Sequence, residues 1–323
     1  MSKISICITY YNQKDFVQES LDSVLAIEFP CDYEILCGDD GSNDGTLEII
    51  KKYADKYPSH IRYFVMDRTE TGKAINRASQ NRLNLAKNAT GNYIMFLDGD
   101  DFYCDKNFIN DSLNVFEKNK NIEACAFDYK YLYEDKSEKT IKQNIKSGHI
   151  RSTDYIKNSI YIPSGAFVFK NILDREKLDL LEKINNFDDN AITIYFLQFG
   201  DIYYLDRPIY TYRQLADSLW NSANTTEQSL INAFDYKLIC DSAPVFSFPL
   251  AKRLNSCVKH IYKNRNSLPS LLSTKYEKYV SAAKNHGDVF MLFLLQYKKL
   301  NFLDKIRTRI MWCNYKRKVK LND

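Results

Sequence analysis

The N-terminal part of the chain alternates short apolar runs with amphipathic stretches. The apolar, β-branched runs predict strands at residues 4–8, 34–38, 61–65 and 93–98. Apolar positions three and four residues apart predict helices between them, at 46–57 and 75–89. This alternation predicts parallel βαβ units, whose right-handed crossovers bring the carboxyl ends of the strands to one edge of a sheet. We therefore expect an α/β domain with a ligand crevice along that edge.

Polar clusters follow three of these strands, at residues 9–12, 39–45 and 98–101. Two carboxylates about 5 Å apart repel by about 3 kcal/mol at an effective dielectric near 20, so Asp98 and Asp100 predict a compensating cation. Their hard oxygen atoms suit Mg²⁺ or Mn²⁺, which keep positions open for substrate phosphates. Gly99, which lies between them, has no Cβ, so it tolerates unusual backbone angles and would let a ligand approach closely. The alternative is a solvated acidic turn that caps the following helix.

Composition narrows the class of protein. The 323 residues are 45% hydrophobic, which indicates a globular protein and excludes global disorder. The net charge of +4 is too small to indicate a nucleic-acid partner. The eight cysteines form no C-x-x-C pair, so a cytoplasmic location is expected. No signal peptide is expected, and the apolar run at 289–295 is too short to span a bilayer.

Three motifs carry a family resemblance. Residues 4–12, 39–46 and 91–101 resemble, in order and spacing, the family 2 glycosyltransferases of the GT-A fold, over about residues 1–215. The resemblance implies a mostly parallel, Rossmann-like sheet flanked by helices. It also implies an inverting transfer from a nucleotide-sugar donor, with UDP favoured as the nucleotide.

The resemblance assigns roles to the residues at the edge of the sheet. Thr9 and Tyr11 would line the base, and Asp40 would accept the N–H of the pyrimidine ring. Asp98 would lie near the ribose and the metal, and Asp100 would bind the Mn²⁺ or Mg²⁺ ion that bridges the diphosphate. Alternatively, the acids at 39–44 serve as turn and capping residues. We prefer this interpretation for Asp44, as the N-cap of the next helix.

Residues 68–82 depart from the family pattern. The family usually has a glycine-containing loop and an Ala-Arg-Asn run here, whereas this chain has Ser-Gln-Asn at 79–81. Arg77 is the expected donor-binding residue, but Lys73 and Arg82 are open alternatives. Each of these cations also has a simpler interpretation, as a solvated helix residue.

The acceptor half contains a second acidic pair. Residues 186–190 open a helix and resemble the family's acidic motif, whose second acid is the general base, and this implies Asp189. The free amides at a helix start would keep this carboxylate ionised, whereas the alternative is that Asp188 and Asp189 only cap the helix. Residues 164–169 are predicted to form a strand.

The run at 201–213 also matches the family, which often continues with a histidine where this chain has Leu215. A histidine metal ligand is therefore not expected. Arg213, with Ser218 and Trp220 in the loop that follows, is expected to close over the diphosphate and the sugar and to exclude water.

The last hundred residues are expected to be helical. The predicted domains are a catalytic domain at 1–222, with a nucleotide-sugar half at 1–103 and an acceptor half at 104–222, and a helical region at 223–323. Near the end, an apolar seam repeats at heptad spacing among many basic residues, and it consists of Leu303, Ile306, Ile310 and Cys313. This seam indicates either contact with the inner face of the cytoplasmic membrane or packing on the catalytic domain or a second subunit.

The motifs together predict a metal-dependent hexosyl- or N-acetylhexosaminyltransferase. Its acceptor would be a saccharide or a lipid-linked saccharide in cell-surface glycan synthesis. One alternative is a sugar nucleotidyltransferase, which would be expected to carry a Gly-rich basic loop after the first strand. Another is an inactive saccharide-binding or assembly protein of the same fold, which metal-dependent donor hydrolysis would distinguish from an enzyme.

Overall fold

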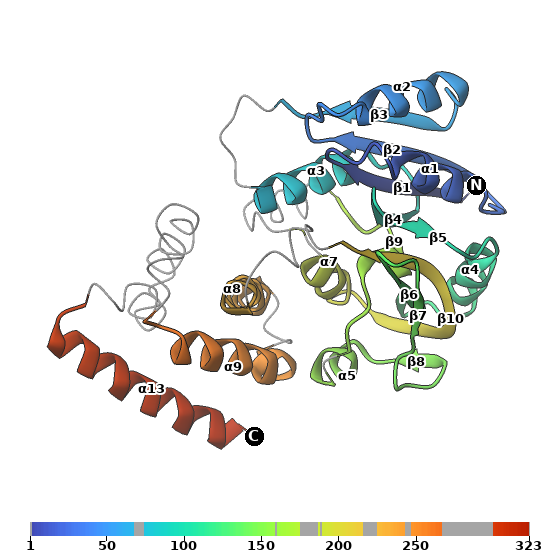
Figure 1. Cartoon of the computed structure of the whole chain (residues 1–323). Helices are drawn as coiled ribbons and strands as arrows, with labels where there is room; N and C mark the ends of the chain where they lie inside the picture. The colour runs from blue at the N-terminus through green and yellow to red at the C-terminus, as the bar shows by residue number, and fades with distance from the viewer. Residues whose placement is uncertain are drawn as a thin grey trace. The chain divides into compact units, whose positions relative to one another are not determined.

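The computed structural model describes residues 2–67, 74–158, 160–174, 187, 189–215, 225–242, 247–266 and 300–322. The chain divides into two compact units, Met1–Ser218 and Leu219–Asp323. The first unit contains the sheet and its flanking helices, and the described part of the second consists of helices (Figure 1).

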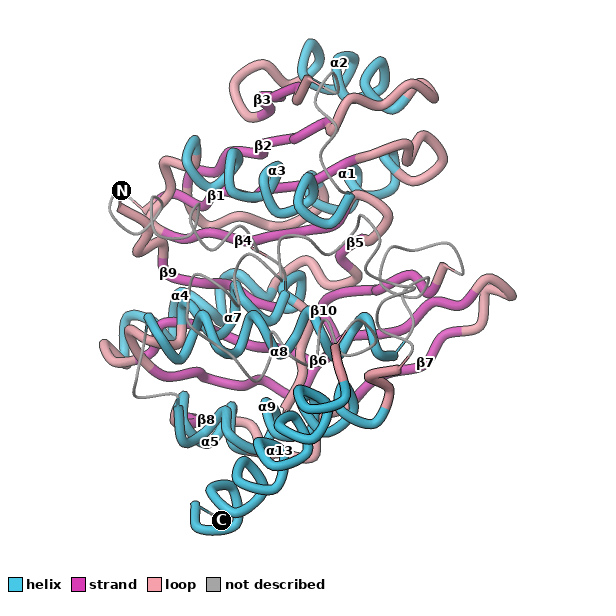
Figure 2. The backbone as a smooth tube through the Cα atoms, turned by 90° about the vertical axis from the view of Figure 1, so that its left-hand side faces the viewer, coloured by secondary structure: helices cyan, strands magenta, loops and turns pink. Residues whose placement is uncertain are grey.

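A ten-stranded sheet runs through the first unit in the order β3-β2-β1-β4-β9-β6-β10-β5, with β7 paired to β6 and β8 to β10 (Figure 2). The strands of its N-terminal half are β1 (Lys3–Tyr10), β2 (Asp32–Asp39), β3 (Ile61–Val65) and β4 (Tyr93–Asp98). Those of the other half are β5 (Phe102–Tyr103), β6 (Ile122–Tyr133), β7 (Glu138–Ile141), β8 (Gly148–Ile150), β9 (Phe167–Lys170) and β10 (Asp201–Gln214).

The N-terminal half is parallel. Strand β1 lies between β2 and β4, and its register pairs Thr9 with Gly38 on one side and with Asp98 on the other. The flanking helices are α1 (Val17–Leu25), α2 (Thr46–Lys56) and α3 (Ala74–Asn88). Helices α1 and α2 contact each other, and α3 packs on β1 and β2 after a crossover that runs the opposite way along the sheet. The predicted α/β fold is confirmed, and three strand ends share one edge.

The second half of the sheet mixes directions. Strand β9 is antiparallel to both β4 and β6, whereas β10 is parallel to β6. The register of β10 shifts on both sides of Pro208, because a proline has no N–H to donate to a ladder. The remaining helices of this unit are α4 (Phe108–Lys118), α5 (Ser152–Lys157) and α7 (Asp189–Phe196).

An aromatic cluster forms the core beneath the site. The Phe96 ring on β4 lies 5.4 Å from that of Phe187 and 6.4 Å from that of Phe196 on α7. Phe169 on β9 stacks on Phe196 at 4.5 Å. All four side chains are buried. Helix α7 is therefore held against the middle of the sheet by ring packing.

Two local expectations were wrong. The predicted strand at 164–169 begins as a 3₁₀ turn, Ser164–Ala166, and only then becomes β9. Gly45, at φ 104°, occupies the N-cap position of α2, although Asp44 still accepts the Thr46 N–H at 3.0 Å.

The second unit contains α8 (Thr225–Ser242), α9 (Ser247–Lys263) and α13 (Phe302–Asn322). Helix α9 packs against both α8 and α13. Trp312 of α13 stacks on Tyr262 of α9 with ring centroids 4.4 Å apart. Within the part of the chain that the structure describes, none of the helices has the length and apolar character needed to cross a bilayer.

Candidate active site

The loops after β1, β2 and β4 are joined by hydrogen bonds at one edge of the sheet. The Asp40 N–H donates to the Tyr10 carbonyl, and the Gly99 N–H donates to the Thr9 carbonyl, both at 2.9 Å. The Thr9 hydroxyl donates to Asp98 Oδ1 at 3.1 Å. The structure therefore brings Thr9, Asp40 and Asp98 together, as the parallel topology requires.

Helix α3 holds the end of β2 by two polar side chains. Arg77 Nη2 lies 2.6 Å from Asp40 Oδ1, and Arg77 Nε donates to Asp40 Oδ2 at 3.2 Å. These side chains are only 6% and 7% exposed, so the pair is a buried bidentate ion pair. Asn81 Nδ2 donates to the Gly38 carbonyl at 2.8 Å. In this structure Arg77 therefore fixes the carboxylate predicted to read the base.

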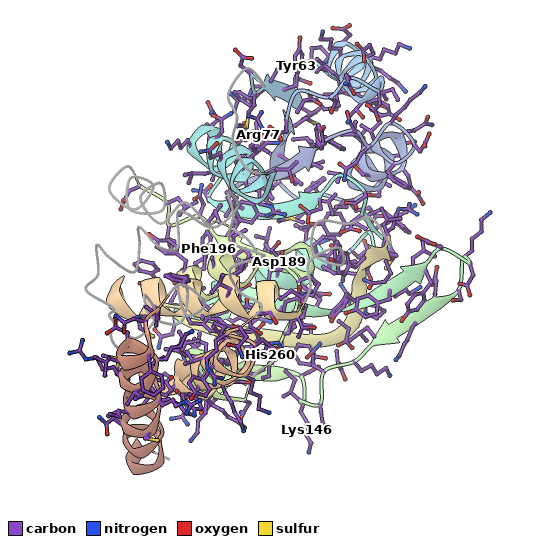
Figure 3. The ribbon with its side chains drawn as sticks, turned by 60° about the vertical axis from the view of Figure 1, so that its left-hand side comes forward. Tyr63, Arg77, Lys146, Asp189, Phe196 and His260 are labelled. Atoms are coloured by element: carbon purple, nitrogen blue, oxygen red, sulfur yellow. The ribbon has the colours of Figure 1, made fainter. Side chains whose placement is uncertain are left out.

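The same helix joins the end of β4 to the segment that leads into α7. Arg82 Nη2 donates to Asp98 Oδ1 at 2.5 Å, and Arg82 Nη1 donates to the Phe187 carbonyl at 3.4 Å. The Phe187 N–H donates to Ser79 Oγ at 2.9 Å. Figure 3 shows Arg77 on this helix and Asp189 nearer the middle of the unit. Of the two alternatives to Arg77, Arg82 contacts Asp98, whereas Lys73 lies outside the described residues.

The charge of Asp98 acts on the neighbouring carboxyl of Asp100. Burial, and next the charge of Asp98, raise the pKa of Asp100 to about 6, against the opposing effect of nearby Arg213. Gly99 separates the two acids for a steric reason: a Cβ at that position would lie 2.1 Å from Cδ1 of the buried Tyr10 ring. The group that lies closest to a Cβ at Gly99 in this structure is therefore the Tyr10 side chain.

The third acid of this cluster anchors β10. Asp101 Oδ1 accepts the Arg213 N–H at 2.8 Å, and Asp101 Oδ2 accepts the Tyr210 hydroxyl. Arg213 Nε donates to the Asp100 carbonyl at 2.5 Å, and its guanidinium also pairs with Glu19. Arg213 therefore lies beside the predicted metal ligands but is engaged by protein groups. Trp220 and Ser218 lie outside the described residues.

Asp189 is the first residue of α7, and three donors orient its carboxylate. Its Oδ1 accepts the Ser164 hydroxyl at 2.5 Å and the Ser164 N–H at 3.1 Å. Its Oδ2 accepts the Tyr161 hydroxyl at 3.1 Å. Ser164, which supplies two of the three donors, is the first residue of the 3₁₀ turn Ser164–Ala166.

Tyr212 of β10 connects the two acidic groups. Burial raises the pKa of its hydroxyl, and the charge of Asp189 and then those of Asp101, Asp98 and Asp100 raise it further. The predicted base and the predicted metal ligands thus act electrostatically on the same phenol.

Several polar partners of the site escaped the sequence analysis. Ser164 and Tyr161 donate to Asp189, the Ser79 hydroxyl accepts the Phe187 N–H, and the charges of both acidic groups act on Tyr212. The Tyr-Thr-Tyr-Arg run at 210–213 was a usable signal, because alternate residues of a strand share one face. Tyr11, which follows β1, is 41% exposed.

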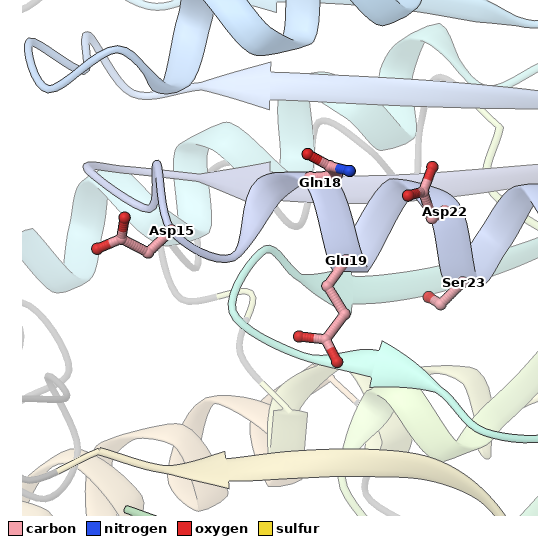
Figure 4. Close-up of a pocket in the computed structure, with 5 residues that line it drawn as sticks. All are labelled: Asp15, Gln18, Glu19, Asp22 and Ser23. Atoms are coloured by element: carbon pink, nitrogen blue, oxygen red, sulfur yellow. The ribbon is translucent and has the colours of Figure 1, made fainter.

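A separate surface hollow lies on α1 and is lined by Asp15, Gln18, Glu19, Asp22 and Ser23 (Figure 4). None of the predicted site residues lines it. Two of its acids already have protein partners: Asp22 accepts the Tyr53 hydroxyl at 2.7 Å, and Glu19 pairs with Arg213.

Comparison with known proteins identifies the family. A family model described as glycosyl transferase family 2 matches residues 5–176, more than half of the chain. The chain belongs to glycosyl transferase family 2. The motifs at 39–46 and 91–101 lie inside the matched region, and the motif at 4–12 lies inside it from residue 5 onward.

Curated relatives of this family 2 member match it over shorter stretches. It is 39% identical over 101 residues to a poly(ribitol-phosphate) beta-glucosyltransferase of Bacillus spizizenii, a match covering 31% of this chain and 15% of that protein. It is 36% identical over 128 residues to an uncharacterised glycosyltransferase of Mycoplasma pneumoniae, covering 39% and 40% of the two chains. The matches thus span less than half the length of either relative.

Solved structures show the fold. The chain superposes on S. aureus TarS 1–349 in complex with UDP-GlcNAc with a TM-score of 0.60 and 18% identity, covering 90% of this chain and 81% of that one. At that identity the likeness establishes the GT-A architecture, a mostly parallel sheet flanked by helices.

The carboxylates at the end of β4 suit part of a metal site. Within the described ranges, no group of three or more His, Cys, Asp and Glu side chains is arranged to hold a metal ion. Asp98 and Asp100 supply hard oxygen ligands, and a cation would oppose the burial and the Asp98 charge that together raise the pKa of Asp100. A Mg²⁺ or Mn²⁺ ion held by two carboxylates usually completes its shell with water and substrate phosphates, so the donor set fits.

Proposed function

We propose that this family 2 protein transfers a sugar from a UDP-sugar to a glycan acceptor with inversion at the anomeric carbon, in the synthesis of a bacterial cell-surface polysaccharide. The donor would bind at the shared edge of β1, β2 and β4. Thr9 and Tyr11 would line the base, and Asp40 would accept a ring N–H while Arg77 holds its carboxylate in place.

One observation carries the proposal. Arg82 bonds both to Asp98, at the predicted donor site, and to the carbonyl of Phe187, two residues before Asp189. This guanidinium sets the spacing between the donor carboxylates and the predicted base. A saccharide-binding protein would not need both a carboxylate oriented by three hydrogen bonds and an acidic nucleotide-sugar site. A group-transfer enzyme needs the two held in a fixed relative position.

Asp189 would take the proton from the acceptor hydroxyl as that oxygen attacks the anomeric carbon. The Ser164 and Tyr161 hydroxyls orient its two oxygens, so the carboxylate presents a defined lone pair to the acceptor. Asp98 and Asp100 would hold Mn²⁺ or Mg²⁺, and the bound ion would neutralise charge on the departing diphosphate. Arg213 would add a contact to the donor from the end of β10, and a donor contact by Trp220, which lies outside the described residues, stays a prediction.

The relatives suggest the kind of donor and acceptor. The Bacillus relative is named for glucosyl transfer to poly(ribitol-phosphate), and the TarS complex contains UDP-GlcNAc. A hexosyl or N-acetylhexosaminyl donor and a polyol-phosphate or saccharide acceptor are therefore proposed for this chain. The reaction would take place on the cytoplasmic side, where nucleotide sugars are made.

Thermal unfolding with a panel of nucleotide sugars, with and without Mn²⁺, tests the donor site. A donor at a hundred times its Kd should stabilise the protein by about 2.7 kcal/mol. Asp100→Ala should abolish the part of this stabilisation that depends on metal. Asp55→Ala, a change of the same type at an exposed position of α2, should leave it intact.

Asp189→Asn tests the chemistry separately. It should keep donor stabilisation while lowering the transfer rate by about 10²- to 10⁴-fold, because it removes a positioned base. Asp55→Asn serves as its control. Normal turnover by Asp189→Asn would assign the base to another residue, and donor binding without transfer or hydrolysis by the unaltered protein would favour the inactive binding protein.

A further inference from the structure

We propose that α13 attaches the protein to an anionic lipid bilayer through an outer stripe, defined here as Phe302, Leu303, Ile306 and Ile310. These side chains are 77%, 67%, 39% and 55% exposed, which is unusual for four large apolar residues on one helix. Three of them belong to the seam that the heptad spacing singled out.

The outer stripe is not the face by which α13 packs inside its own unit. At about 100° per residue, its four positions fall within about 100° of the helix circumference. The face on the other side contains Thr308, which is fully buried, and Trp312, which stacks on Tyr262 of α9. The Tyr315 hydroxyl on that face bonds to Asn255 of α9. Internal packing therefore uses one side of α13 and leaves the stripe outward.

Basic residues border the stripe on both sides. On the helical wheel Lys305 and Arg309 lie along one flank and Arg307 along the other, where Arg307 also pairs with Asp304 at 3.1 Å. Residues 300–323 contain seven Lys and Arg against two Asp, a net charge of +5, whereas the whole chain carries +4. The positive charge of the chain is thus concentrated on this segment.

This combination selects a lipid surface over a second copy of the chain. A symmetric contact through the stripe would place the basic flanks of two copies against each other, and like charges across an interface disfavour association. An anionic leaflet accepts the apolar side chains among its acyl chains and attracts the flanking cations. Such a helix lies in the interface, consistent with the finding that no described helix is suited to crossing the bilayer.

The proposal is tested by vesicle co-sedimentation of the full chain. Donor and acceptor are left out of the assay, so that its result does not depend on the proposed activity. Vesicles of phosphatidylcholine alone are compared with vesicles that also contain phosphatidylglycerol, whose anionic headgroups make the surface negative. Binding should require the anionic lipid and weaken with salt. R307Q/R309Q should bind about 25-fold more weakly, about fivefold per charge. K51Q/K52Q, which removes two exposed charges from α2, should bind normally.

The apolar contribution is tested by I306S/I310S, which should lower vesicle affinity by about tenfold or more without lowering thermal stability, because both positions are exposed. Tyr63→Ser, at a residue 41% exposed on β3, is the matched control. Equal binding to neutral and anionic vesicles would overturn the proposal, as would normal binding by I306S/I310S. Equally tight binding to soluble polyphosphate, unchanged by I306S/I310S, would identify a polyanion in place of the bilayer. A dimer in sedimentation that only I306S/I310S dissociates, with vesicle binding unchanged, would make the stripe a subunit interface.

Discussion

Glu34 ties together the three strands that bring the donor residues to one edge. Its Oε1 accepts the Ser5 hydroxyl of β1 at 2.7 Å, and the N–H and hydroxyl of Thr90, just before β4, at 2.7 and 2.8 Å. Its Oε2 lies 2.9 Å from Arg62 Nη2 and 3.3 Å from Lys3 Nζ. The residue is only 5% exposed. Every partner of this carboxylate is a hydrogen-bond donor. Replacing Glu34 with glutamine would substitute an amide NH₂, itself a donor, for one of the two acceptor oxygens.

The size of the effect follows from the pKa of this carboxyl. Burial alone would raise it, but the hydrogen bonds from Ser5 and Thr90 and the charge of Lys3 lower the pKa of Glu34 from 4.5 to about 2. At 1.36 kcal/mol per pKa unit, this difference corresponds to about 3 kcal/mol of folding stability. Because the folded-state pKa is the lower one, the contribution is complete above about pH 5 and is lost as the pH falls toward 2.

Urea unfolding followed by circular dichroism, at intervals from pH 7 to pH 2, measures the prediction for the unaltered chain and for Glu34→Gln. The stability difference between them should be largest above pH 5 and should narrow by about 3 kcal/mol by pH 2. Glu117→Gln, at an exposed glutamate of α4, should show no such narrowing. A difference that stays constant over the whole pH range would show that the Glu34 pKa is not lowered by folding.

Three substitutions test the site itself. Arg77→Ala removes the guanidinium from the buried carboxylate of Asp40 and should destabilise the protein by about 3 kcal/mol, measured by urea unfolding; a cost below about 1 kcal/mol would mean that the pair is solvated. Gly99→Ala places a Cβ against the buried Tyr10 ring and should cost about 1–3 kcal/mol and weaken donor stabilisation in the same thermal assay. Unchanged donor binding would show that the turn adapts. Ser164→Ala removes one of two Ser164 bonds to the proposed base and should lower kcat by about tenfold at constant donor KM, whereas a matching rise in KM would indicate a general distortion.

Much of the donor half could be predicted from the sequence because its elements are set by local pattern. The apolar run at 93–98 and its acidic ending are the β4 strand and its exit, and the amphipathic stretch at 75–89 is α3 within one residue at each end. Parallel βαβ topology then placed Thr9, Asp40 and Asp98 at one edge without any knowledge of contacts.

What the sequence by itself determined is therefore which residues form strands and helices and which polar clusters lie at the strand ends, since periodicity records the buried face of each element. Only the tertiary structure determined which side chains and backbone groups contact one another. Arg77 reaches Asp40 across 37 positions, Arg82 reaches the Phe187 carbonyl across 105, and the Ser164 N–H reaches Asp189 across 25. The same holds for α13, where packing on α9 chose the face of Trp312 and left Ile306 and Ile310 outward. Such choices depend on three-dimensional packing between segments far apart in the chain, which no local repeat encodes.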